Sequence, residues 1–274
     1  VIESLKKLQQ KPTNIRSDIV VSAIRSSPSP QVQNKLLLVI AALATLSPEM
    51  ILHSVMPIFT FMGAHTIRQD DEYSTHVVEN TIKAVVPALM SSSGSKKNEL
   101  DFLLTTFAAA FPHVPKHRRV KLFTTLINTL NPELAVSPFL FLIGEQYSTS
   151  VQKFKISESK EFIAFCRSFL SKLPAVEQLK GILGVFELVA KLPTSFVYFE
   201  NPEGMREQML KEALFSNSII NLDYFAVNKL KKNLLQFINK LVVDDSNDYY
   251  SDGSLKLKIL TLLTDEEADS TSIE

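Results

Sequence analysis

The chain has 274 residues, of which 45% are hydrophobic and 21% are charged, so it is long enough and apolar enough to bury a sizeable core. Its 29 Lys and Arg residues balance its 29 Asp and Glu residues, which excludes an overall positive field that would attract nucleic acid. The single cysteine, Cys166, excludes an intramolecular disulfide and a multi-cysteine metal site and fits a reducing compartment.

The chain begins with VIESLKKLQQ, which has neither a starting Met nor the pattern of a signal peptide. We therefore expect a piece of a longer protein. The longest apolar run, 36–46, is much shorter than the roughly 20 residues that a membrane-spanning helix needs. No membrane partner is expected.

Apolar residues recur at helical spacing along the whole chain, and no stretch alternates convincingly with the period of a strand. Ser47-Pro48-Glu49 and Asn131-Pro132-Glu133 combine a capping residue with proline at the first helical position, which is a typical helix start. SSSGSKKN at 91–98 has the composition of a flexible linker. The predicted helices cover residues 13–25, 31–46, 48–62, 71–90, 99–111, 116–130, 132–147, 157–173, 175–192, 203–216 and 222–243, with one more before a polar tail at 265–274 that we expect to be disordered.

One stretch, 53–89, combines the features of a helical-repeat unit. Pro57 should kink the first helix or begin a new turn, because proline has no N–H to donate. Gly63 should end that helix with a positive φ. Asp70 and Asp71 should cap the second helix, where negative charge is favourable, and Arg68 should pair with one of them or with an acid of the next repeat.

The spacing of the helices predicts a solenoid. The first helices of successive pairs begin near 13, 48, 98, 132, 175 and 222, an average interval of about 42 residues, and HEAT and armadillo units run roughly 40–47 residues. We predict an all-α, HEAT-like α-solenoid of about six helical hairpins, forming one domain over 1–274. A compact all-α bundle is the alternative.

The stretch HSVMPIFTFMG, followed by RQDDEYS and then VVPAL, resembles the U-three small nucleolar RNA-associated protein ten family. The resemblance covers at most residues 36–90. These proteins are very large HEAT-repeat scaffolds of the ribosomal small-subunit processome. The matching residues, among them Pro57, Gly63, Arg68, Asp70 and Asp71, are carried over as repeat-forming residues only.

The resemblance implies a non-catalytic scaffold in the nucleus and nucleolus, linked to precursor rRNA processing and to rDNA transcription. Its implied partners are other processome proteins and precursor ribosomal RNA or small nucleolar RNA, with no cofactor, metal or small-molecule substrate. Two alternatives stay open: a karyopherin-like or other HEAT-repeat adaptor outside ribosome biogenesis, and an enzyme's helical domain. The absence of Trp weighs against the first, and the lack of a nucleophile–base constellation weighs against the second.

The strongest local charge is the basic run of Lys116, Arg118, Arg119 and Lys121 at a predicted helix start. We interpret it either as a solvated face or as a contact for RNA phosphates or an acidic partner protein. Lys229, Lys231 and Lys232 form a weaker cluster further along the chain.

Other reactive residue types have structural interpretations. His113 and His117 have the spacing of metal ligands, but prolines interrupt their helix and no third ligand stands near. Cys166 lies among phenylalanines, as a buried, inert thiol does. Gly181 and Gly184 lie inside a helix, where glycine permits close helix approach. The acidic loop 244–253 lacks the closing glutamate of a calcium loop, and its two tyrosines could anchor a partner.

Overall fold

The computed structural model describes residues 16–51, 54–66, 70–91, 96–192, 219 and 222–243. These ranges are helical and contain no strand. The helices are α2 (Ser17–Ser26), α3 (Pro30–Leu46), α4 (Pro48–Ile51), α5 (Val55–Ala64), α6 (Glu72–Ser91), α7 (Lys96–Ala110), η3 (Phe111–His113, a 3₁₀ turn), α8 (Lys116–Leu130), α9 (Pro132–Gln152), α10 (Ile156–Leu170), α11 (Ala175–Lys191) and α15 (Tyr224–Val242).

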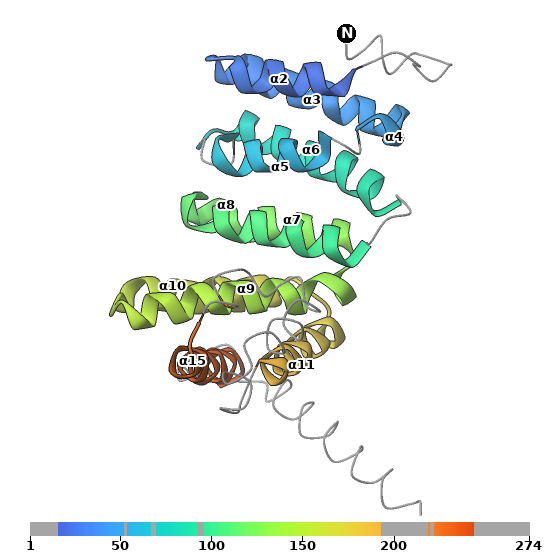
Figure 1. The fold of residues 1–274 in the computed structure, drawn as a ribbon. Helices are drawn as coiled ribbons and strands as arrows, with labels where there is room; N and C mark the ends of the chain where they lie inside the picture. Colours follow the sequence, from blue (N-terminus) through green and yellow to red (C-terminus); the bar gives the residue numbers. More distant parts are fainter. Residues whose placement is uncertain are drawn as a thin grey trace, which may run out of the picture.

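The helices from α2 to α10 stack as hairpins in two layers (Figure 1). One layer holds α2, α5, α7 and α9, and the other holds α3, α6, α8 and α10; neighbours within each layer pack on one another. Each hairpin thus buries its apolar stripe against the hairpins before and after it, as a solenoid requires. The predicted all-α, HEAT-like solenoid is confirmed.

Beyond α10 the stack changes direction. Figure 1 shows α15 end-on beneath α9 and α10, with α11 beside it, and both pack against α9. The sixth predicted hairpin start, near 222, corresponds to α15. The predicted helices at 203–216 and before the tail, the tail itself and the loop 244–253 lie outside the described residues.

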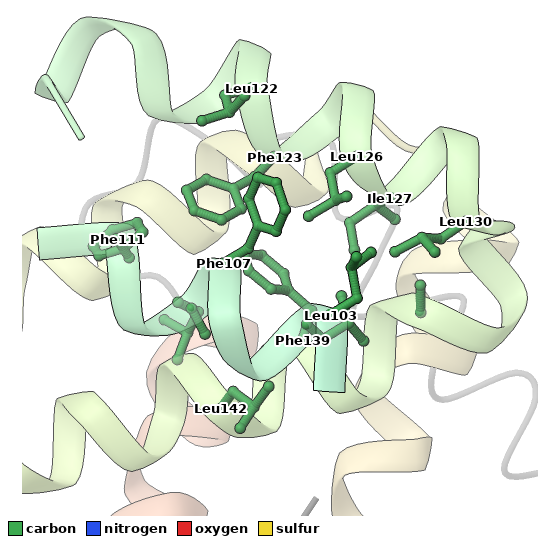
Figure 2. Packing of buried hydrophobic residues seen from close by; sticks show 14 of the residues in the cluster. Leu103, Phe107, Phe111, Leu122, Phe123, Leu126, Ile127, Leu130, Phe139 and Leu142 are labelled. Carbon is green, nitrogen blue, oxygen red and sulfur yellow. The ribbon is translucent and has the colours of Figure 1, made fainter. Parts of the chain in front are cut away.

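Phenylalanine rings connect successive layers of the core. Phe111 of η3 lies 5.6 Å from Phe123 of α8, and Phe123 lies 5.0 Å from Phe139 of α9. Phe139 in turn lies 5.3 Å from Phe169 of α10 in an edge-to-face arrangement, which favours the ring quadrupoles. Figure 2 shows Phe107, Phe111 and Phe123 among leucines of α7, α8 and α9. Cys166 is fully buried beside this cluster, and burial raises the pKa of its thiol far above the ordinary value.

Two glycines allow α11 to approach α9 closely, as predicted. A Cβ added to Gly181 would collide with the side chain of Val136, and one added to Gly184 would collide with Ser137. Both partners lie on α9, so any larger residue would push the helices apart.

Several boundaries differ from the predicted ones. The helix predicted over 48–62 is divided into α4 and α5, and Pro57 lies in the first turn of α5, where its missing N–H has no helical partner to lose. Gly63 does not end α5, which continues to Ala64 and is followed by His65 with φ −126°. The linker predicted at 91–98 is shorter, because α6 includes Ser91 and α7 begins at Lys96.

Candidate interaction surface

The basic run lies on the first turns of α8, and two prolines place it there. Pro112 is the second residue of η3, and Pro115 directly precedes α8 with φ −52° and ψ 132°. Its carbonyl accepts the N–H of Arg118 at 2.9 Å, which starts the helix. The run therefore faces α6 on one side and α10 on the other, since α8 packs between them.

On the α6 side, three side chains of α8 contact acids of the preceding repeat. Arg118 Nε lies 2.8 Å from Asp70 Oδ1, and Arg118 Nη1 donates to the Asp71 carbonyl at 2.5 Å. His117 Nε2 is 3.3 Å from the same Asp70 oxygen. Lys121 Nζ lies 2.9 Å from Oε1 of Glu79, a nearly buried carboxylate of α6.

On the α10 side, Glu161 binds two further cations. Lys116 Nζ is 2.5 Å from Glu161 Oε1, and Arg119 Nη1 is 3.7 Å from Glu161 Oε2. Together with the contacts on α6, these contacts form a set of ion pairs and one histidine–carboxylate contact across three repeats, which we call the α8 ladder: Lys116, His117, Arg118, Arg119 and Lys121 with Asp70, Glu79 and Glu161.

Arg119 differs from the other basic residues of the ladder because it is buried. Its Nε donates to the Val114 carbonyl at 2.9 Å, and its guanidinium lies 4.4 Å from the centre of the Phe111 ring. Burial lowers the pKa of Arg119, and the charge of Glu161 partly offsets this effect. Arg119 thus fastens the loop before α8 to the helix, a structural task.

Lys116 and Lys121 are the ladder cations with the most accessible side chains, each 71% exposed. Lys116 can exchange its partly exposed partner Glu161 for a phosphate at little cost, because exposed ion pairs contribute at most about 1 kcal/mol. The same exchange costs more at Lys121, because it leaves the nearly buried Glu79 carboxylate without its cation. If the run contacts RNA or an acidic protein, these two residues are the ones able to do so.

The acids of the repeat-forming stretch have structural partners. Asp71 caps α6: its Oδ1 accepts the Ser74 N–H at 2.7 Å, and hydrogen bonds from Ser74 lower the pKa of its carboxyl. Asp70 pairs with Arg118, so an inter-repeat contact joins an acid of this turn to a base of the next repeat, the opposite polarity to the predicted pairing of Arg68 with an acid of the next repeat. Arg68, the base named in that prediction, lies outside the described residues.

Sequence reasoning missed a groove between α6 and α8. A hollow of about 720 Å³ is lined by Glu72, Tyr73, Thr75, His76, His117, Arg118 and Lys121. Tyr73 is half exposed there, next to the exposed Lys121. Tyr73 and His76 are three residues apart on a helix, a spacing that puts both on one face and could have indicated this groove.

The two histidines considered as metal ligands have different surroundings. His117 faces Asp70, whereas His113 lines a separate hollow between α5 and α7. Within the described ranges, no three His, Cys, Asp or Glu side chains gather as metal ligands would. Among the same residues, no helix has both the length and the apolar character needed to cross a bilayer.

Comparison with known proteins identifies relatives along almost the whole chain. A family described as HEATR1-like, HEAT repeats, matches residues 95–261. The chain is 53% identical to U3 small nucleolar RNA-associated protein 10 of Kluyveromyces lactis over 96% of its length. The proteins of that name from Eremothecium gossypii and Saccharomyces cerevisiae are each 49% identical, over 98% and 95% of the chain.

The chain spans about 15% of the length of these relatives. The resemblance inferred from the 53–89 stretch is confirmed, and it extends well beyond residues 36–90 in both directions.

Proposed function

This chain belongs to the HEATR1-like family of HEAT repeats, and we propose that it is a non-catalytic scaffold segment of a nucleolar ribosome-biogenesis protein. In this role it helps to hold the early small-subunit processome on precursor ribosomal RNA. The observation that carries the proposal is the identity of about half of all residues with U3 small nucleolar RNA-associated protein 10 over nearly the whole chain. The same identity favours this role over a karyopherin-like adaptor.

The geometry supports a scaffold. One cluster of buried apolar side chains runs from Val21 to Leu241, so we treat the chain as one HEAT-like domain. The α8 ladder adds ion pairs between successive repeats, which resist bending of the stack. We propose that the segment is not an enzyme. Its thiol supports this, because burial keeps Cys166 protonated and out of reach of a substrate.

We propose other processome proteins as partners, with precursor ribosomal RNA or small nucleolar RNA contacted through Lys116 and Lys121. Both are exposed, and the half-exposed Tyr73, in the groove that Lys121 also lines, offers a ring on which a base can stack. The balanced net charge of the chain restricts such a contact to local patches. Work in the nucleus and nucleolus follows from this role.

The test compares two double variants of the full-length protein in cells. Lys116→Ala/Lys121→Ala removes the exposed ladder cations, and Lys229→Ala/Lys232→Ala removes the same charge from exposed positions on α15. Ultraviolet cross-linking then measures precursor RNA bound to each protein. We expect the first variant alone to lose most of its cross-links. Equal RNA yields from both variants would restrict the ladder to its structural role, and complete absence of the unaltered protein from precursor particles would refute the scaffold.

A further inference from the structure

The turn between α9 and α10 places an aromatic residue where a helix usually has glycine. After α9 ends at Gln152, the Phe154 N–H donates to the Val151 carbonyl at 3.1 Å, and the Lys155 N–H donates to the Ser150 carbonyl at 2.9 Å. This pair of bonds is a Schellman motif, which needs a left-handed residue at its centre. Phe154 takes that conformation with φ 56°. Glycine adopts it freely, whereas a bulky side chain is disfavoured there.

The side chain of Phe154 does not pack into the core of the fold. Phe154 is 90% exposed, and Ile156, the first residue of α10, is 68% exposed. The unfavourable backbone conformation opposes folding, and the ring, exposed before and after folding, offsets none of that cost. Glycine would remove the backbone strain. Residues that break local rules without a gain in packing concentrate at sites of function.

The surroundings of the pair indicate what it binds. Lys153 and Lys155 flank Phe154 in the sequence and are exposed. Lys155 Nζ lies 2.6 Å from Glu158 Oε1, an exposed pair that a partner's carboxylate can replace. The turn therefore has an apolar centre with positive flanks. Its complement is an apolar pocket with an acidic rim.

A protein fits this chemistry better than a nucleic acid does. A single-stranded base could stack on Phe154 between the two lysines. Ile156, however, has no π face and gains only from apolar burial, which a protein pocket supplies. We propose that Phe154 and Ile156 dock into an apolar, acid-rimmed pocket of a partner protein. This contact adds to the scaffold role a protein-binding point separate from the Lys116 and Lys121 surface.

The first arm of the test uses Phe154→Gly in the full-length protein, isolated with its assembled partners. Because glycine suits the turn, we expect unchanged or greater resistance to heat and protease. We also expect one co-purifying protein to fall about tenfold or more, as for loss of a central aromatic contact. Leu134→Ala, which trims an exposed apolar residue at the other end of α9, is the matched control and should lose no partner.

The second arm identifies the occupant. A photoreactive benzoyl-phenylalanine replaces Phe154, or Leu134 as control, in the full-length protein, and the assembly is irradiated with and without nuclease. The proposal expects a nuclease-resistant adduct from position 154 with the same protein that Phe154→Gly loses, and weaker adduct formation with Lys153→Glu/Lys155→Glu. A nuclease-sensitive adduct, an adduct with a protein that Phe154→Gly retains, or an unchanged Phe154→Gly assembly would each overturn it. RNA cross-linking through Lys116 and Lys121 is measured separately, so either proposal can fail alone.

Discussion

Arg118 and Asp70 belong to different repeats, and their side chains meet at 2.8 Å where α6 and α8 begin. The contact joins the acidic turn that starts α6 to the first turn of α8. Arg118 also donates to the Asp71 carbonyl, so one guanidinium binds both the side chain and the backbone of that turn. The contact therefore adds a polar tie between two stacked hairpins at the start of both helices.

A double-mutant cycle should separate the ion pair of Arg118 with Asp70 from the hydrogen bond of Arg118 to the Asp71 carbonyl. We expect a coupling energy of about 0.5–1 kcal/mol between Arg118→Ala and Asp70→Ala, because Asp70 is more than half exposed and salt screens it. Arg118→Ala should cost more than Asp70→Ala, since it also removes the bond to the Asp71 carbonyl. Urea unfolding at low and high salt measures both quantities. Equal losses from the two single variants would contradict the role given to that carbonyl.

Arg119 and Lys116, two basic residues in the same turn of α8, should differ strongly in their contribution to the free energy of unfolding. Arg119→Ala should lower the free energy of unfolding by about 2–3 kcal/mol, because it removes buried bonds of a charged group to two carbonyls and its packing on Phe111. Lys116→Ala, in the same helical turn, should cost less than about 1 kcal/mol. Thermal or urea unfolding of both variants checks the contrast, and similar losses would show that Arg119 is not the fastening residue.

Glycine replacement in α11 should reverse the usual effect of alanine in a helix. On propensity alone, Gly181→Ala would stabilise a helix by about 1 kcal/mol. We expect a loss of about 1–3 kcal/mol instead, since the new methyl group would meet Val136. Val136→Ala should recover part of that loss when combined with Gly181→Ala. Independent, additive losses in urea unfolding would mean that the two residues do not meet across the α9–α11 contact.

The sequence predicts the solenoid and many of its helix boundaries because these depend on local signals. Pro48 and Pro132 begin helices as expected, and Asp71 caps α6. Gly63 misled the prediction of a helix end, since α5 goes one residue further and ends without a left-handed residue. The end of α9 is expected near 147 but lies at Gln152. The prediction misses it because Phe154, and not glycine, takes the left-handed conformation in the turn that follows.

The partners of the basic run could not be predicted, for a physical reason. Glu79 lies on α6 and Glu161 on α10, the helices on either side of α8 in its layer. The distances from Glu79 to Lys121 and from Glu161 to Lys116 therefore depend on how the repeats stack. Charge pattern along one helix cannot specify that register. The sequence thus predicts a basic surface, whereas the structure divides it into a buried arginine, Arg119, a second arginine, Arg118, bound to the turn before α6, and two exposed lysines with acidic partners.

The single thiol should report on unfolding. Cys166 has no exposed surface, and burial raises the pKa of its thiol. Ellman's reagent at pH 8 should therefore react with the folded chain only at the rate at which the core opens, and with one thiol per chain in urea. Rapid stoichiometric labelling without denaturant would show that the Phe165–Phe169 region is open to solvent.

The cap of α6 should make the stability of the chain depend on acid. Hydrogen bonds from Ser74 place the folded-state pKa of Asp71 below its unfolded value of about 3.9. A depressed folded pKa contributes stability that is complete above the unfolded pKa and is lost as the pH falls through the folded pKa. Asp71→Ala should cost about 1 kcal/mol at pH 7 and progressively less below pH ~4. Asp71→Asn keeps a capping oxygen without the charge, so its loss at pH 7 should be smaller. Urea unfolding of the three proteins between pH 7 and pH 3 measures the difference, and a gap between Asp71 and Asp71→Ala that widens on acidification would have the wrong sign for this cap.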